Sequence, residues 1–242
     1  AVRDQITGIA GSVGRTVSYF TDAARLSAFT GSMAVTSSSI IYTRVTRTDV
    51  TPGCTNDGVI TFNINSLPTA ISGVIDVCED TQGTNTATAL NLLLLESQIT
   101  NNAPGVTVSW FTDAGRTIPV VSPNNQTVTG SRVYYTRVVN NATGCENTAT
   151  TTVTVNPRPS TAPIVGETNV CTDPNALHIY QVTALPGSTF QWSIPTDFVT
   201  HLGGTSADFF ALLKFPNPVS PGKVISVAER SAKGCLGPVQ TL

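Results

Sequence analysis

The sequence predicts an all-β protein made of β-sandwich modules in tandem, arranged as an elongated rod. Threonine occurs 38 times in the 242 residues, and its branched side chain favours strands. Landmark peptides recur about every 90 residues, a period typical of a small β-sandwich rather than of a solenoid. The last strand of a module runs straight into a joint marked by prolines, so each module should begin and end at opposite ends, which gives a rod.

Composition excludes several classes of function. The net charge is -2 and charged residues make up 12% of the chain, so no basic surface for nucleic acid or anionic lipid is expected. An apolar share of 40% argues against disorder. No apolar run reaches the length that a membrane-spanning helix needs, so we expect no membrane span.

An internal repeat is the clearest feature of the sequence. The peptide VSYFTDAARLSAF begins at Val17, and VSWFTDAGRTIPV begins at Val108, 91 residues later. The peptide IYTRV (residues 41–45) recurs as YYTRV (134–138), and a weaker third copy contains STFQWSI (188–194) and AKGC. The repeat predicts modules at residues 1–67, 68–158 and 159–242. We expect the first to be truncated at its N-terminus, and the third could also be cut short at its C-terminus.

Strands follow from alternation of apolar and polar residues. In VITFNI (59–64), Ile60, Phe62 and Ile64 share one face, and in TTTVTV (150–155) the valines point inward. Turn residues separate such runs, as in TDAG after Phe111. The one helical candidate is LNLLLLESQ (90–98), which we expect to form one or two turns that cap a sandwich.

The five cysteines follow the repeat. Cys54, Cys145 and Cys235 lie 91 and 90 residues apart, and Cys78 and Cys171 lie 93 apart. No C-x-x-C pair is present, so disulfides are expected rather than a structural zinc site. Because each complete module contains two cysteines, the register predicts the pairs Cys78–Cys145 and Cys171–Cys235 and leaves Cys54 unpaired.

Four aromatic residues are predicted to lie in the module cores: Tyr19, Trp110, Tyr135 and Trp192. The alternative for the tryptophans is stacking on a sugar ring. Each tryptophan lies within an apolar row of a strand, the place where sandwich cores bury such a residue, so core packing is favoured.

The sequence offers only weak candidates for chemistry. Asp22 and Asp113 of the FTDA peptides could bind calcium between modules, but aspartate is also a common hairpin-turn residue, and the turn is favoured. His178 and His201 have no accompanying nucleophile motif. We therefore expect no catalytic residue, no resident metal and no cofactor.

The two complete modules resemble known families. VSWFTDAGRTIPV…VYYTRVVNNATGCENTATTTVTVNPRP resembles the Ig-like modules found in tandem in very long surface proteins of Bacteroidota. APIVGETNVCTD…PGSTFQWSIP…GKVISVAERSAKGC resembles the PKD-like modules found beside them. The resemblance implies secretion, often through the type IX system, with gliding adhesins among the best-known carriers. It implies no binding or catalytic residue.

Two functions are compatible with this organisation. The chain is predicted to be a non-catalytic structural and adhesive stalk segment of a large secreted protein at the cell surface. The alternative is a set of spacer modules in a secreted polysaccharide-degrading enzyme. The expected partners are neighbouring modules of the same longer chain and secretion or cell-surface proteins, and the sequence does not identify the extracellular ligand.

Overall fold

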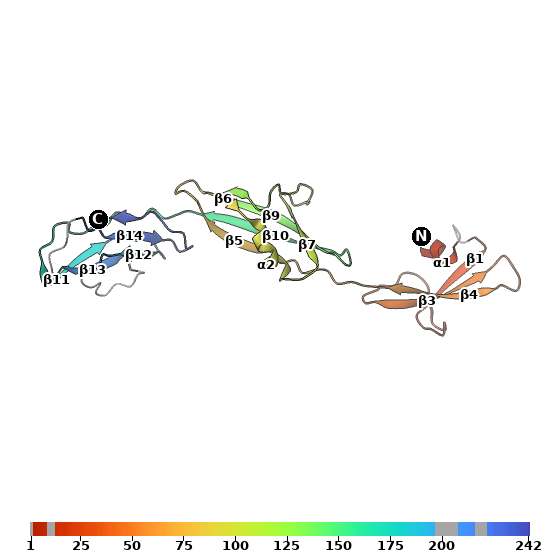
Figure 1. The fold of residues 1–242 in the computed structure, drawn as a ribbon. Helices are drawn as coiled ribbons and strands as arrows, with labels where there is room; N and C mark the ends of the chain where they lie inside the picture. Colours follow the sequence, from red (N-terminus) through yellow and green to blue (C-terminus); the bar gives the residue numbers. More distant parts are fainter. Residues whose placement is uncertain (1, 9–12, 197–207, 216–221) are drawn as a thin grey trace. The chain divides into compact units, whose positions relative to one another are not determined.

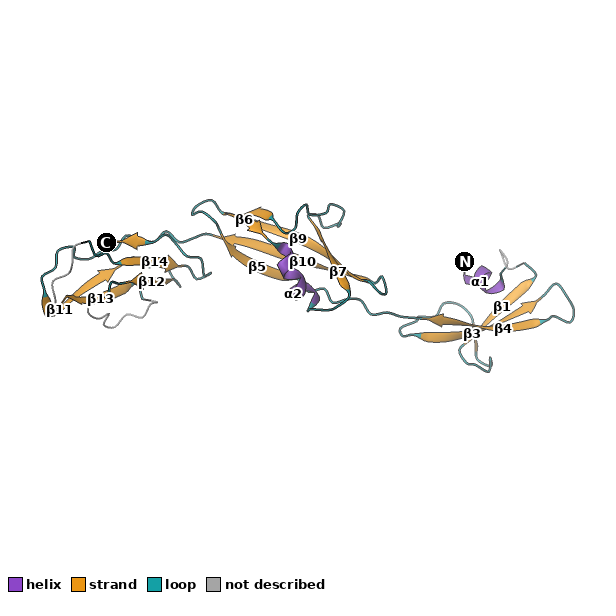
Figure 2. Ribbon diagram, viewed as in Figure 1, coloured by secondary structure: helices purple, strands orange, loops and turns teal. Residues whose placement is uncertain are grey.

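The computed structural model describes residues 2–8, 13–196, 208–215 and 222–242. The chain is all-β: strands dominate and helices are few and short (Figures 1 and 2). It divides into two units, residues 1–66 (unit 1) and residues 67–242 (unit 2). Each unit is described by itself.

In its described residues, unit 1 contains one short helix and one antiparallel sheet. The sheet has the strand order β2-β1-β3-β4. Its elements are α1 (Val2–Thr7), β1 (Arg15–Phe20), β2 (Ala28–Phe29), β3 (Ser39–Arg47) and β4 (Thr55–Phe62). Strand register brings Tyr19 opposite Thr43, and Ile41 opposite Ile60, so these side chains share one face of the sheet.

The first part of unit 2 is a sandwich, here called the middle sandwich. Its main sheet has the order β5-β10-β9-β7, in which β5 and β10 are parallel and the other pairs antiparallel. These strands are β5 (Gly73–Cys78), β7 (Val106–Phe111), β9 (Ser131–Asn140) and β10 (Glu146–Asn156). The alternating burial along β10 agrees with the period of two read from TTTVTV, because Val153 and Val155 are buried.

A second layer covers one face of the middle sandwich. It consists of the paired strands β6 (Thr86–Leu90) and β8 (Gln126–Thr129), the 3-10 helix η2 (Leu92–Leu95) and α2 (Glu96–Thr100). The two helical turns occupy the segment predicted to be helical. Leu92 and Ile99 from these turns pack with Trp110, Tyr134 and other buried residues into one core.

The remainder of unit 2, residues 164–242, forms the C-terminal sandwich. One sheet pairs β11 (Asp173–Gln181) with β13 (Phe210–Phe215). The other has the order β12-β14-β15, from β12 (Thr189–Ser193), β14 (Ser226–Arg230) and β15 (Gln240–Thr241). A separate core that includes Tyr180, Phe190 and Val227 lies between them.

Candidate functional site: a cross-linked junction between two sandwiches

The junction is built where β5 and β10 end together. Because these strands are parallel, Cys78 at the end of β5 lies opposite Asn156 at the end of β10. The chain then continues from Asn156 through residues 157–163, here called the joint, into the C-terminal sandwich. Two chain segments of the middle sandwich therefore arrive side by side at the C-terminal sandwich.

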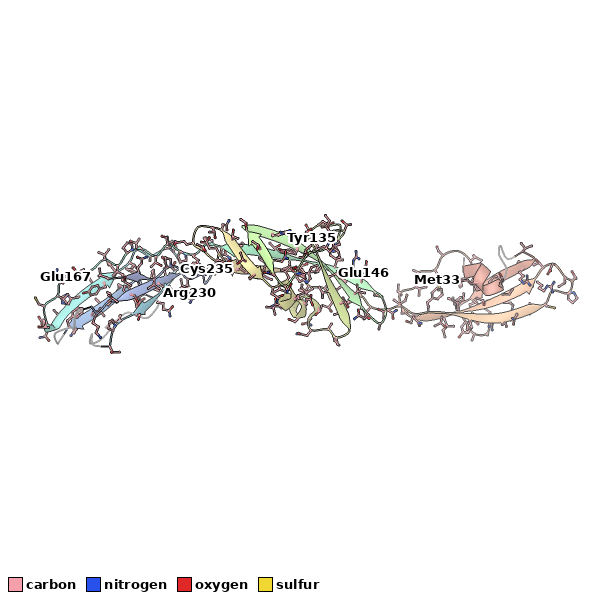
Figure 3. The ribbon with its side chains drawn as sticks, turned by 45° about the horizontal axis from the view of Figure 1, so that its top comes forward. Met33, Tyr135, Glu146, Glu167, Arg230 and Cys235 are labelled. Atoms are coloured by element: carbon pink, nitrogen blue, oxygen red, sulfur yellow. A yellow bond between two sulfur atoms is a disulfide. The ribbon has the colours of Figure 1, made fainter. Side chains whose placement is uncertain are left out.

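A disulfide between Cys78 and Cys235 links the two sandwiches. Their Cα atoms are 5.5 Å apart, and 157 residues separate them in sequence. Cys235 is only 1% exposed (labelled in Figure 3). It lies in a hairpin after β14, in which Ser231 N–H donates to the Cys235 carbonyl. The bond is thus an inter-sandwich cross-link that is shielded from solvent on the Cys235 side.

Glu79, the next residue after Cys78, is the centre of a hydrogen-bond cluster. Its side chain is 1% exposed, and its carboxylate accepts from the backbone N–H groups of Gly83 (2.9 Å), Asn85 (2.6 Å) and Arg158 (2.9 Å). The Gly83 N–H above all, together with the Arg158 and Asn85 N–H groups, lowers the pKa of Glu79 below its usual value, because each stabilises the carboxylate. The charge therefore holds the turn after β5 and the joint in one arrangement.

Arg158 ties three chain segments together. Its backbone N–H binds the Glu79 carboxylate, and its Nε donates to the backbone carbonyl of Glu79 at 2.6 Å. Its Nη1 donates to the carbonyl of Leu236 at 3.0 Å, next to the disulfide on the C-terminal sandwich. A planar guanidinium can serve two acceptors in fixed directions, which a lysine cannot do equally well.

Weaker contacts surround this centre. Lys233 Nζ lies 2.9 Å from Asp76 Oδ2, and Asn156 Nδ2 donates to the other oxygen of Asp76. These side-chain hydrogen bonds, first that from Asn156, lower the pKa of Asp76. The ion pair is exposed to solvent and contributes little stability.

Gly237 allows the backbone of the C-terminal sandwich to approach the joint closely. A Cβ at this position would collide with the Pro159 carbonyl oxygen and meet Thr161 Oγ1. Thr161 Oγ1 accepts in turn from the N–H of Glu229. A side chain at position 237 would therefore push the joint away.

The structure corrects the predicted disulfide pairs Cys78–Cys145 and Cys171–Cys235. Cys78 lies beside the end of β10, whereas Cys145 immediately precedes its start at Glu146. Ten residues of strand separate these positions, about 33 Å at about 3.3 Å per residue, while a disulfide needs Cα atoms within about 7 Å. Cys54, Cys145 and Cys171 are free, as was predicted for Cys54 alone.

Cys171 is also at the wrong end of its sandwich to reach Cys235. Its neighbour Val170 lines the same pocket as Ile225, which precedes β14. Cys235 instead follows the end of β14, close to the joint. The separation along β14 places the two cysteines at opposite ends.

The three cysteines of the repeated hairpin occupy equivalent positions. Arg47 N–H donates to the carbonyl of Cys54, Asn140 N–H to that of Cys145, and Ser231 N–H to that of Cys235, at 2.8–2.9 Å. Cys145 therefore has in the middle sandwich the backbone environment that Cys235 has in the C-terminal sandwich. The repeat conserves the hairpin within this chain, and Cys235 carries the cross-link.

The repeated FTDA peptides form a turn closed by an aspartate. The Asp22 carboxylate accepts from the N–H groups of Leu26 and Ser27, and the Asp113 carboxylate accepts from those of Thr117 and Ile118. Backbone donation, mainly from Ser27 and Ile118, lowers the pKa of Asp22 and Asp113 respectively. The favoured turn is therefore what both carboxylates form, and in the described residues no group of three or more metal-ligating side chains gathers around them.

Sequence reasoning missed the arginine of the same turn. Arg25 and Arg116 both have a left-handed backbone, with φ of 58° and 56°. Nε of Arg25 donates to the Thr43 carbonyl and Nε of Arg116 to the Thr136 carbonyl, at 3.2 and 3.0 Å. Each guanidinium also lies over a tyrosine ring of the adjacent strand. The conserved spacing FTDAxR between the two copies is the signal that could have indicated this anchored turn.

Of the predicted core aromatics, Trp110 is buried and Tyr135 is not. Trp110 is 4% exposed, and its Nε1 donates to the Glu96 carboxylate at 3.1 Å. Tyr135 lies on the outer face of β9 beneath Arg116 (Figure 3), and its neighbour Tyr134 is the buried residue, at 0% exposure. The prediction for Tyr135 is wrong by one position, and in a strand one position changes the face.

The other two predicted core aromatics are partly buried. Trp192 packs against the C-terminal core, and its Nε1 donates to the Asp208 carbonyl at 2.9 Å. Tyr19 lies on the face of the unit 1 sheet that carries Ile41 and Ile60, 5.9 Å from the Phe29 ring between centroids. The Trp192 ring therefore packs on the core, which is the favoured interpretation for that tryptophan, rather than stacking on a sugar.

Of the two histidines, His178 lies in the part of the chain that the structure describes, where it contacts a carboxylate and an aromatic ring. His178 Nδ1 lies 2.8 Å from Glu167 Oε2, and its ring packs at an angle on Phe215. His201 lies outside the described residues. Over the described parts of the chain, no helix is long and apolar enough to cross a membrane.

Comparison with known proteins gives a match to the middle sandwich. Residues 74–159 match the family model described as the Flavobacterium inter-domain disulphide bond domain. The matched segment includes Cys78, Glu79 and Arg158 and stops before the C-terminal sandwich. The match supports the resemblance to modules of Bacteroidota. No curated protein matches the chain.

Solved structures with immunoglobulin and cadherin domains are similar in a general way. A structure of three titin immunoglobulin domains is similar over 96% of this chain and 88% of its own, at 9% identity and a TM-score of 0.32. The N-terminal eight immunoglobulin domains of the Down syndrome cell adhesion molecule are similar over 97% of this chain and 35% of their own, at 10% identity and a TM-score of 0.35. Murine CEACAM1b is similar over 69% of this chain and 91% of its own, at 12% identity and a TM-score of 0.31. Such scores carry no argument on function. By the family model, the middle sandwich is similar to a Flavobacterium module, and the description of that module names the kind of bond that joins Cys78 to Cys235.

Proposed function

We propose that this chain is a segment of a non-catalytic stalk in a large secreted protein, where it holds an adhesive part away from the cell surface. The observation that carries the proposal is the junction, in which consecutive sandwiches are joined by the Cys78–Cys235 disulfide as well as by the chain itself. A stalk requires defined joints between its modules, and this junction fixes one through a covalent bond and the contacts of Arg158.

The proposed location is extracellular. Disulfides persist in oxidising compartments and are rare in the cytosol. A covalent cross-link between sandwiches is useful where no cellular machinery repairs unfolded segments. The family match to a Flavobacterium module supports a surface protein of Bacteroidota, and we extend the proposal to export by the type IX system and to an adhesin that could serve gliding.

The proposed partners follow from this arrangement. Neighbouring modules of the same longer chain contact the segment directly, and proteins of the secretion or surface machinery hold the whole molecule. The polar groups described at the junction are engaged within the chain, so we do not expect the extracellular ligand to bind at the junction itself.

The test uses cells that produce the longer protein. An in-frame deletion of the codons for residues 67–242 is compared with their replacement by two unrelated sandwich domains. We expect a protease added outside intact cells to cleave the protein, which tests its location. We expect the deletion to reduce attachment to a surface and the replacement to restore it. Unchanged attachment combined with a changed turnover of polysaccharide would instead favour spacer modules of an enzyme.

A variant separates the junction from mere length. With Cys78→Ser and Cys235→Ser together, the number of modules is unchanged but the cross-link is lost. We expect attachment to fall while export and the amount of protein at the surface stay the same. Equal attachment by this variant and by the unchanged protein would contradict a role for the locked junction.

A further inference from the structure

One face of the unit 1 sheet is an open apolar groove. It has a volume of about 330 Å³ and is lined by Tyr19, Met33, Val35, Ile41, Ile60 and Phe62, with others. Met33 (labelled in Figure 3) is 39% exposed, and Ile64, which follows β4, is 49% exposed. An apolar surface of this kind on a sheet normally lies against a second layer.

The internal repeat shows which face this is. Tyr19 lies opposite Thr43, as Trp110 lies opposite Thr136, and Ile41 lies opposite Ile60, as Tyr134 lies opposite Thr151. The groove is therefore the equivalent of the core face of the middle sandwich. There, Trp110, Tyr134, Thr136 and Thr151 are all at most 5% exposed.

Two strands complete the core around that face in the middle sandwich, one by widening the sheet and one by joining the second layer. β5 adds to the outer edge of β10 in parallel, from Gly73 opposite Thr151 to Cys78 opposite Asn156. β6 pairs with β8, with Ala87 opposite Val128. In the following residues, η2 and α2 add Leu92 and Ile99 to the core.

Unit 1 has the helix of this arrangement but not the two strands. The peptide DQIT at the end of α1 corresponds to SQIT at the end of α2, 93 residues later. In the described part of unit 1, β4 is the last strand of the sheet, so its outer edge carries no neighbour. Residues 33–36, which correspond to β8, form no strand there. The two unfilled edges are the ones that β5 and β6 fill in the middle sandwich.

We propose that this face of unit 1 is the docking site for a segment of the β5–β6 type, joined directly to α1 in the same polypeptide. Such a segment would pair in parallel with β4 and in antiparallel with residues 33–36. The short connection between β6 and η2 supports this occupant, because only Asn91 separates them in the middle sandwich. A segment of this type that fills both edges of unit 1 would therefore end where the helix begins. Register places the equivalent of Ile75 beside Phe62 and that of Val77 beside Ile64, two apolar pairs.

The experiment supplies the segment. The full 242-residue chain is extended before Ala1 by a copy of residues 68–93, so that Ala1 takes the place of Leu94, and Cys78 is copied as serine to prevent exchange of disulfides. The control extension has the same length, with Ile75 and Val77 copied as aspartate. These two side chains point inward in β5, where both are partly buried.

The measurement is amide hydrogen exchange in peptides that cover β4 and residues 33–36. We expect exchange to slow at least about tenfold with the matching extension and to stay unchanged with the control, because ladder hydrogen bonds protect amides. The same slowing is expected when a peptide of residues 68–94 is added to the unextended chain at high concentration. This second measurement tests the proposal even if the extended chain fails to fold.

Other outcomes overturn the proposal. Equal exchange with both extensions and with the free peptide would mean that the face does not accept this segment. If sedimentation shows that the unextended chain dimerises, and Phe62→Asp returns it to a monomer, a second copy is the occupant instead.

Discussion

The carboxylate of Glu79 accepts a hydrogen bond from the backbone N–H of Arg158, and the guanidinium of Arg158 donates back to the backbone carbonyl of Glu79. The two distances are 2.9 and 2.6 Å. This reciprocal pair joins the residue after β5 to the joint, and Arg158 extends it to Leu236 of the C-terminal sandwich. The disulfide and this pair lie at neighbouring residues, so their contributions to stability are expected to be coupled.

Replacing Glu79 by glutamine should lower the stability of unit 2 at neutral pH and weaken its dependence on acid. The pKa of Glu79 is lowered in the folded state, so its contribution is fully present above the usual value of 4.5 and is lost as the pH falls below that value. Urea midpoints of the wild type and of Glu79→Gln should therefore differ most at neutral pH and converge in acid.

The control for this variant is Glu146→Gln, because the side chain of Glu146 (labelled in Figure 3) is 56% exposed and pairs only loosely with Arg137. The control should behave as the wild type at each pH. A difference between wild type and Glu79→Gln that stays constant across the pH range would mean that the charge of Glu79 does not stabilise the junction.

Removing the cross-link should have the largest effect. In the chain-entropy model, a disulfide that closes a loop of 157 residues stabilises by about 5 kcal/mol, and measured losses are typically about 2–5 kcal/mol. Cys78→Ser combined with Cys235→Ser should lower the free energy of unfolding accordingly, and a reductant should do the same to the wild type. Cys145→Ser should change it by less than about 0.5 kcal/mol.

Peptide mapping without reduction checks the pairing directly. The peptide that contains Cys78 should be recovered joined to the one that contains Cys235. Recovery of Cys78 joined to Cys145 would contradict the junction described above.

Alanine at position 237 should weaken the junction although the substitution is small. Its Cβ would collide with the Pro159 carbonyl, so we expect a loss of about 1–3 kcal/mol, as for other overpacked sites. Gly73→Ala is the matched control, since no atom lies within 4 Å of a Cβ built there. Thermal unfolding of the two variants decides the matter, and equal midpoints would count against close packing at the joint.

The anchored arginine of the repeated turn should also stabilise its module. Arg116→Ala removes the hydrogen bond to the Thr136 carbonyl and the contact with the Tyr135 ring, and we expect a loss of about 1–3 kcal/mol. Arg116→Gly should recover part of it, because glycine adopts a φ of 56° without strain. Arg132→Ala, on the exposed part of β9, should have a smaller effect in the same urea titration.

Local features of the fold could be predicted because they depend on neighbouring residues. The alternation in TTTVTV determines which side of β10 is buried, and Asp113 closes its turn with donors only four and five residues away. Tyr135 shows the limit of such reasoning. Two tyrosines in succession leave the choice of face to the register of the whole sheet.

The junction could not be predicted because it depends on strand direction. Counting cysteines per module assumes that a pair closes within it, but β5 runs parallel to β10 and carries Cys78 to the end far from Cys145. Only the parallel pairing, which no local pattern reveals, brings Cys78 to the neighbouring sandwich. Arg158 was missed for the same reason, since its acceptors lie 79 and 78 residues away.

The cross-link also changes how tension would pass through unit 2. A pull on the backbone at Leu67 and Leu242 follows residues 67–78, crosses the disulfide and leaves along residues 235–242, so the residues between the two cysteines carry no load. Fully stretched, this route measures about 70 Å at roughly 3.5 Å per residue, whereas the whole unit without the bond would reach about 600 Å. One sulfur–sulfur bond therefore makes unit 2 a nearly inextensible link, and its reduction would turn the same link into a long, yielding tether.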